Sequence, residues 1–202
     1  MEILYSDKEI VVCIKPVGLD AEAEVPQQLK AQLGGEIFTL HRLDKNVGGV
    51  MVYARAKTAA AKLSKVIQDG QMVKEYVAMV HGCPPESGDW QDLLFKDSRK
   101  NKVFVVKKQR AGVKAARLEF QRLQQGERSL VAIRLHTGRS HQIRVQFSSR
   151  GMPLVGERKY SELDDPCEIA LWSYRLAFSH PKTGEKMEFT HQPPESYPWT
   201  EV

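Results

Sequence analysis

The chain has 202 residues, of which 42% are hydrophobic and 27% charged, and its formal net charge is +5. This composition is typical of a folded globular protein and argues against global disorder. No apolar run approaches the roughly 18 residues of a membrane-spanning helix. The N-terminus carries acids where a secretory signal has basic residues. We therefore expect a cytoplasmic protein without a membrane contact.

The first half of the chain alternates apolar strands with short helices. We predict a buried strand over residues 9–16, which ends at a proline, and a second apolar strand over residues 50–54. A short helix is expected over residues 26–35, with proline at its start and glycines at its end. Residues 57–70 form a clear amphipathic helix pattern that stops at Gly70.

The second half is richer in strands. We predict a strand over 72–82, a loop over 82–90 and a strand over 103–106. A hairpin of strands 116–123 and 128–136 follows, and two late strands cover 169–178 and 186–191. Residues 137–151 have a helical pattern in which Ser140 is the expected cap, and Ile143 and Phe147 face inward. We predict one α/β (α+β) domain, residues 1–202, with a mixed, mainly antiparallel sheet and flanking helices.

The sequence contains none of the common motifs for binding a metal ion or a nucleotide. Cys13, Cys83 and Cys167 are widely spaced and odd in number, which supports neither a disulfide framework nor a zinc site. The motifs HExxH, GxxxxGK[ST] and GxGxxG are absent from the sequence. Metal hydrolysis, P-loop phosphoryl transfer and dinucleotide chemistry therefore have no sequence support.

Positive charge is concentrated in residues 96–117, which hold nine lysines or arginines and one acid. This segment carries +8 and the rest of the chain 5 − 8 = −3. Such a basic block suggests a surface for a polyanion such as nucleic acid. A solvated hairpin with long cationic side chains explains the charge equally well.

Three stretches hold candidate catalytic residues. HRLDK (41–45) places Asp44 before two glycines, where it is either a base or nucleophile or part of a polar turn. In 135–147, Arg139 suits a phosphate, and His141 and Arg144 share a helix face, unless they are an ordinary solvated cap. Tyr76, in KEYVAMVHG (74–82), offers a ring for a base to stack on, or simply packs in the core.

These three stretches, in this order, resemble the motifs of the RluA-type family of pseudouridine synthases. HRLDK resembles the catalytic motif, KEYVAMVHG the tyrosine-bearing strand motif, and TGRSHQIRVQFSSRGMPLVGERKY the long third motif. Their joint occurrence is far more specific than any one of them. The resemblance implies the pseudouridine synthase catalytic fold with an active-site cleft, and an isomerase that converts a specific uridine of tRNA or rRNA into pseudouridine.

The resemblance also implies roles for individual residues. Asp44 aligns with the essential aspartate, Arg144 with the arginine that pairs with it, and Tyr76 with the tyrosine that stacks on the target uracil. Arg42 corresponds to the arginine that holds the flipped-out nucleotide. The predicted RNA-binding residues are His41, Arg42, Arg139, His141, Lys107, Lys108 and Arg110. No metal or cofactor is expected, because the reaction is an isomerisation.

The chain departs from the family pattern at some positions. Asn46-Val47-Gly48-Gly49 replaces a segment that usually carries hydroxyl groups, and Gln146 and Glu157 stand where histidine and aspartate are frequent. We expect neither Gln146 nor Glu157 to contact the catalytic residues. Family similarity begins near residue 3, so we expect no separate N-terminal RNA-binding domain and predict a monomer without an obligate protein partner. The alternative function is an RNA-binding protein or RNA chaperone on this fold, with catalysis lost.

Overall fold

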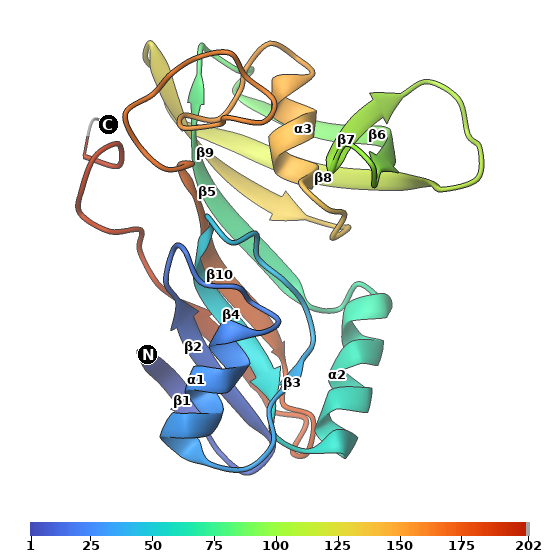
Figure 1. Cartoon of the computed structure of the whole chain (residues 1–202), viewed down its shortest axis with the longest axis vertical. Helices are drawn as coiled ribbons and strands as arrows, with labels where there is room; N and C mark the ends of the chain where they lie inside the picture. Colours follow the sequence, from blue (N-terminus) through green and yellow to red (C-terminus); the bar gives the residue numbers. More distant parts are fainter. Residues whose placement is uncertain (201–202) are drawn as a thin grey trace. The chain divides into compact units, whose positions relative to one another are not determined.

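The computed structural model describes residues 1–200, which fall into two compact units (Figure 1). Unit 1 comprises Met1–Glu75 and Trp172–Pro193, and unit 2 comprises Tyr76–Leu171 and the segment that begins at Pro194. Each unit has strands of its own, and a helix of the same unit packs on them.

The strands of unit 1 are built on two fully buried segments, β2 (Ile10–Lys15) and β4 (Gly48–Ala54). They pair antiparallel, with Val12 opposite Val52. Because both faces of these strands are covered, their sequences are continuous apolar runs without alternation. The remaining strands are β1 (Ile3–Ser6), β3 (Phe38–Thr39), β10 (Leu171–Ser179) and β11 (Lys186–Thr190). The pairings β1–β2, β2–β4, β3–β4 and β10–β11 are antiparallel, and the pairing of β10 with β4 is parallel.

Two helices belong to unit 1, α1 (Glu24–Leu33) and α2 (Lys57–Gln68) (Figure 1). Helix α2 contacts β3 and β4 and buries Ala59 and Leu63, which lie four residues apart on one face. Helix α1 ends where Gly34 adopts a positive φ of 68°, a conformation that glycine reaches without a steric penalty.

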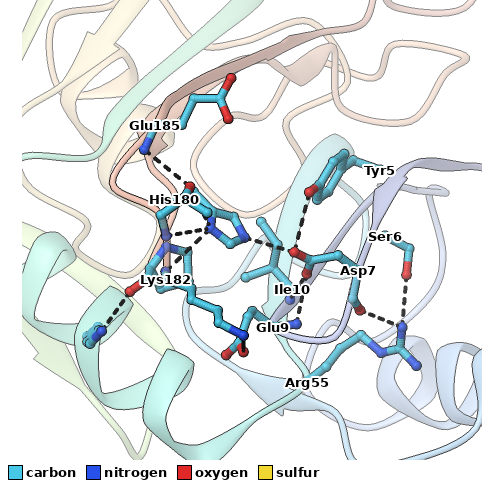
Figure 2. Close-up of polar contacts among 12 residues, drawn as sticks. Tyr5, Ser6, Asp7, Glu9, Ile10, Arg55, His180, Lys182 and Glu185 are labelled. Atoms are coloured by element: carbon cyan, nitrogen blue, oxygen red, sulfur yellow. Dashed lines mark hydrogen bonds and ion pairs between the residues drawn. The ribbon is translucent and has the colours of Figure 1, made fainter.

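A polar cluster joins the β1–β2 turn to the turn between β10 and β11 (Figure 2). The buried His180 ring lies with Nε2 3.0 Å from Asp7 Oδ2, and its Nδ1 accepts from the backbone N–H groups of Lys182 and Thr183. Asp7 Oδ1 also accepts from the N–H groups of Glu9 and Ile10, both at 2.8 Å. Since Nδ1 is an acceptor, the proton of a neutral ring lies on Nε2 and is donated to Asp7.

We predict that this cluster stabilises unit 1 in a pH-dependent way. Partial burial raises the pKa of Asp7, but hydrogen bonds from the N–H groups of Ile10 and Glu9 and from the His180 ring outweigh it, so the pKa lies below its ordinary 3.8. The carboxylate therefore contributes stability above pH 3.8 that is lost as the pH falls further. Asp7→Ala should lower the free energy of unfolding at pH 7 by about 2 kcal/mol.

The measurement is urea unfolding of wild type and Asp7→Ala between pH 7 and pH 2.5. The difference between the two proteins should shrink below pH 3.8. The control is Asp69→Ala, which removes an exposed ion pair with Lys65 and should change stability by less than about 0.5 kcal/mol. A difference that stayed constant with pH would show that the Asp7 charge does not stabilise the fold.

Unit 2 is an antiparallel sheet in the order β5-β9-β8-β6-β7 (Figure 1). Its strands are β5 (Val73–His81), β6 (Ser87–Asp97), β7 (Lys102–Val106), β8 (Val113–Gln124) and β9 (Arg128–Leu135). The predicted hairpin is present, with Phe120 opposite Ile133. These residues are buried while their neighbours in each strand are more exposed, as the period of two requires.

Helix α3 (Gln142–Ser148) packs on one face of β6 and β7. Its fully buried Phe147 lies with its ring centroid 4.7 Å from Trp90 and 5.5 Å from Phe120. The Arg150 guanidinium lies over Trp90, 4.2 Å from the ring centroid. This aromatic cluster fixes the helix that carries Arg144 against the sheet.

The predicted α+β class, with a mainly antiparallel sheet and flanking helices, is confirmed, with three corrections. The residues expected to form a loop at 82–90 include the start of β6, which begins at Ser87. The helix predicted over 137–151 is shorter, because residues 137–141 form a turn. The helix begins after His141, whose φ is +51°, and no side chain caps it, so Ser140 is not the cap. None of the helices within residues 1–200 is both long and apolar enough to cross a membrane.

Candidate active site

Asp44 lies in unit 1, in the turn that leads into β4. The N–H of Val47 donates to the carbonyl oxygen of Asp44 at 2.9 Å, which closes a four-residue turn. The N–H of Gly18 donates to the carbonyl of Lys45 at 2.8 Å. Asp44 is therefore part of a polar turn, and that turn is held at defined points of its backbone. A reactive carboxylate needs such a fixed position.

The buried side chain of Lys15 is the main support of this turn. Lys15 is the last residue of the apolar strand β2 and is 0% exposed. Its Nζ donates to the carbonyls of Pro16, Lys45 and Val47 at 2.9, 3.0 and 2.8 Å. Burial lowers the pKa of Lys15 to about 8, while the Asp20 and Asp44 charges oppose the shift. At pH 7 the side chain is therefore an ammonium that can satisfy all three acceptors.

We predict that Lys15→Met loosens the turn that carries Asp44. Methionine fills the space but leaves the carbonyls of Pro16, Lys45 and Val47 without this donor, so the free energy of unfolding should fall by about 3 kcal/mol. The kcat of the folded variant should fall as well, because the turn loses its anchor. Urea unfolding and steady-state kinetics measure the two effects. The exposed Lys8→Met is the control and should change neither; an unchanged kcat in Lys15→Met would refute the positioning role.

The glycines after Asp44 are required by packing against β10. A Cβ on Gly48 would lie 2.3 Å from Cζ3 of Trp172, and one on Gly49 2.3 Å from the backbone oxygen of Ser173. Gly49 also has a φ of +122°, which other residues rarely adopt. The missing hydroxyl group at position 48 therefore has a local structural reason within unit 1, because the Trp172 ring fills the space beside Gly48.

His41 and Arg42 both precede the turn, but one is bound to the backbone of β4 and the other is exposed. The N–H of Val52 donates to Nε2 of His41 at 3.3 Å, and desolvation, aided by the Lys74 charge, lowers the pKa of His41 to about 3. His41 is thus a neutral ring bound to the backbone of β4. Arg42 is half exposed, and its Nη1 lies 2.9 Å from Glu22 Oε2. An exposed ion pair of this kind costs little to open.

Tyr76 and Arg144 belong to unit 2. Tyr76 is in β5 and is 6% exposed. The Arg144 guanidinium forms a bidentate pair with Glu157, with Nε 2.6 Å from Oε2 and Nη2 2.8 Å from Oε1. Glu157 is fully buried and also accepts from the N–H groups of Lys159 and Tyr160. This two-point contact fixes the plane of the Arg144 side chain.

The two ends of the long third motif meet around this pair. Nδ1 of His141 lies 2.6 Å from the hydroxyl of Tyr160, which also accepts from the N–H of Val103 at 2.9 Å. The Arg144 guanidinium lies 5.5 Å from the Tyr160 ring centroid. Residues from the start and the end of the motif therefore form one network with β7.

The expectation that Glu157 stays clear of the catalytic residues is wrong, because Glu157 holds Arg144 directly. The physical reason is that a buried guanidinium requires a carboxylate partner. Gln146 is buried elsewhere, with Nε2 donating to Asp92 Oδ2 at 2.7 Å. Sequence reasoning also missed Lys15 and Tyr160. The available signals were a lysine that ends an apolar strand, and the length of the third motif.

The remaining predicted RNA-binding residues lie on the surface of unit 2. Lys107, Lys108 and Arg110 are exposed in the connection between β7 and β8, and the Arg110 guanidinium lies 4.6 Å from the Phe95 ring centroid. Nε of Arg139 donates to the carbonyl of Ala115 at 2.8 Å. Within residues 1–200, no group of three or more His, Cys, Asp or Glu side chains is arranged to hold a metal ion.

A comparison with protein families identifies the chain. The model of the family described as RNA pseudouridylate synthase matches residues 9–149, well over half of the sequence. The chain belongs to this family. The matched region contains Asp44, Tyr76 and Arg144, and the resemblance inferred from the motifs is confirmed.

Individual members of the pseudouridylate synthase family align with most of the chain. Ribosomal large subunit pseudouridine synthase D of Neisseria meningitidis (serogroup A) is 29% identical over 94% of this chain. tRNA pseudouridine synthase C of Yersinia pestis is 28% identical over 94% of it. The chain spans 57% of the Neisseria protein and 85% of the Yersinia protein. The structure of human RNA pseudouridylate synthase domain containing 4 has the same fold, with a TM-score of 0.80, 24% identity, and coverage of 96% of this chain and 89% of the other.

Proposed function

We propose that this pseudouridylate synthase family member isomerises a specific uridine in tRNA or rRNA to pseudouridine, with Asp44 as its catalytic carboxylate. The observation that carries the proposal is the Asp44 turn, anchored by buried Lys15, in a chain that belongs to the family. The related synthases named above for tRNA and for the ribosomal large subunit support these two RNA classes. We propose that the chain works as a single catalytic domain.

The reaction we propose breaks the bond between uracil N1 and ribose C1′ and forms one between uracil C5 and C1′. In the route we favour, the Asp44 carboxylate takes the C2′ proton, the uracil leaves as an anion, and C5 then bonds to C1′ as the proton returns to C2′. The C5 proton is lost to water and N1 gains one. The atoms of substrate and product are the same, so no redox partner takes part.

The remaining residues act on the nucleotide before and during this exchange. A stacked or paired uridine must first be extruded, at a cost of a few kcal/mol. We propose that Tyr76 stacks on the uracil and that Arg42 holds the flipped nucleotide, since its exposed pair with Glu22 opens easily. Arg144, held in one orientation by Glu157, supplies a fixed positive charge.

We propose further that Lys107, Lys108 and Arg110 attract RNA through its phosphates. Changing all three to glutamine should weaken RNA binding and lower the slope of log Kd against log salt by about 2. Filter binding of an unmodified tRNA transcript between 50 and 300 mM salt measures both effects. An unchanged affinity and slope would remove these residues from the interface.

The proposal includes the setting of the enzyme. We propose a monomer in the cytoplasm, with RNA as its macromolecular partner and no membrane contact. Light scattering of the purified protein at micromolar concentration should give a mass near 22.9 kDa. A stable dimer would contradict the monomer.

The function itself is tested by mapping pseudouridines at nucleotide resolution in tRNA and rRNA transcripts incubated with the protein. RNA binding without any new pseudouridine would favour the RNA-binding protein instead.

A further inference from the structure

A basic pocket lies in unit 2, at one end of β6 and β8. It has a volume of about 170 Å³, well above the ~30 Å³ that one water molecule occupies in the liquid. Its lining residues come from three segments of the chain: β6 with β7, the start of β8, and the turn before α3. They are Leu94, Lys96, Val103, Gly112, Lys114, Gly138, Arg139 and Ser140.

Strand register places two lysines on the same face of the sheet at this pocket. Leu94 lies opposite Lys114, and Lys96 lies opposite Val103. Because residues two apart and residues directly opposite share a face, all four side chains point to one side of the sheet. Leu94 and Val103 pack with Val145 of α3, so this is the face that α3 covers. The pocket thus has a buried apolar floor below exposed ammonium groups.

Arg139, in the turn before α3, is the third cationic side chain of the pocket lining. Its Nε donates to the carbonyl of Ala115, next to Lys114, and its N–H donates to Oε1 of Gln142. The first contact directs the guanidinium toward β8, and the second fixes the backbone of the turn. Ser140 adds a hydroxyl group to the lining. The guanidinium is therefore positioned before any ligand arrives, which reduces the entropy lost on binding.

Lys96, Lys114 and Arg139 differ from several arginines of unit 2, because no acidic side chain in the described part of the chain pairs with them. Arg117, Arg144 and Arg150 each lie within 3 Å of a carboxylate oxygen. Within residues 1–200, by contrast, no carboxylate is within 4.0 Å of the charged groups of Lys96, Lys114 or Arg139. Three like charges that converge on one concavity repel one another unless an anion is present. The lining is complementary to a phosphate group.

We propose that this pocket seats a backbone phosphate of the RNA substrate. The inference rests on the proposed function for the identity of the ligand. The inference adds to the proposed function a defined anchoring point for the RNA, formed by Lys96, Lys114 and Arg139. This point is separate from the exposed residues Lys107, Lys108 and Arg110. A seated phosphate would set where the RNA lies on unit 2 and would contribute no base contact, so it positions the RNA without reading its sequence.

The test compares two triple variants of equal charge change. The pocket variant is Lys96→Gln, Lys114→Gln and Arg139→Gln, and the control is Lys57→Gln, Lys62→Gln and Lys65→Gln on the exposed side of α2. With an unmodified tRNA transcript, the pocket variant should raise Kd and KM about tenfold and lower the salt slope by about 1 for the one phosphate. Equal effects of the two variants on binding would overturn the pocket.

A second measurement tests ligand binding at the pocket without relying on turnover. Inorganic phosphate, and separately a short single-stranded RNA, are titrated into ¹⁵N-labelled protein while the amide signals of Gly112, Gly138 and Ser140 are followed. Saturable shifts with RNA in wild type that vanish in the pocket variant support the site, and shifts with RNA that persist in the variant overturn it. Shifts with phosphate alone but none with RNA also overturn it, since the pocket would then take only the free anion.

The two failures can be told apart. Pocket shifts without pseudouridine formation would contradict the proposed function and leave the RNA-phosphate site standing. Pseudouridine formation that is unaffected in the pocket variant at RNA concentrations below KM would remove the site alone. Arg139→Lys refines the result, because lysine keeps the charge and loses the planar fork, so it should recover part of the lost affinity.

Discussion

Replacing Asp44 by asparagine is expected to abolish pseudouridine formation while leaving RNA binding intact. Asparagine has the shape of aspartate but can neither take a proton from the ribose nor act as a nucleophile at neutral pH. A loss of ~10³-fold or more in kcat is typical when the reacting group itself is removed. Single-turnover assays with saturating enzyme measure the chemical step without the influence of product release.

The control for this variant is Asp69→Asn, which removes a carboxylate of the same unit in an exposed pair with Lys65. It should retain wild-type turnover. The Kd of Asp44→Asn for the same RNA should stay within about threefold of wild type, because RNA affinity comes mainly from cations that contact phosphates and a carboxylate makes no such contact. Residual turnover within tenfold of wild type would show that Asp44 is not the reacting group.

Removing the carboxylate of Glu157 should have the largest effect on stability. Glu157→Ala leaves the Arg144 guanidinium, whose side chain is only 13% exposed, without its bidentate partner. Breaking one side of a buried ion pair costs about 3–5 kcal/mol. Urea unfolding should report a loss of this size, and kcat should fall because Arg144 is no longer held in one orientation.

Conservative variants separate orientation from folding. Glu157→Asp keeps the charge on a side chain shorter by one carbon, so its losses in stability and kcat should be smaller than those of Glu157→Ala. Glu157→Gln retains acceptors for the N–H groups of Lys159 and Tyr160 but lacks the charge, and should fall between them. The exposed Glu162→Ala is the control. If all variants kept wild-type kcat once folded, Glu157 would have a structural role only.

Local sequence patterns predicted much of the fold. The continuous apolar runs at 9–16 and 50–54 are strands because both faces are buried, and the hairpin at 116–136 follows from its period of two. The start of β6 was missed because residues 87–92 are largely polar and pair with β8 through their backbone. The short α3 was overestimated because nothing local indicates the left-handed conformation of His141.

The candidate site was less predictable, since its supports come from distant segments. Lys15 reads as the end of a strand, and only the folded chain shows its ammonium among the carbonyls of Pro16, Lys45 and Val47. Glu157 lies 13 residues from Arg144, and that spacing has no local structural meaning. Asp44, Tyr76 and Arg144 were recognised by their motifs, because their residue types alone fit a turn, a core ring and a solvated helix face equally well.

The most direct test of the central claim uses RNA transcribed with uridine that carries tritium at C5. Moving the glycosidic bond from N1 to C5 releases that hydrogen to water. The proposal predicts that the wild-type protein releases tritium from tRNA or rRNA transcripts over many turnovers, and that Asp44→Asn releases none above background. RNA that binds the wild-type protein without any release would contradict the account and identify an RNA-binding protein instead.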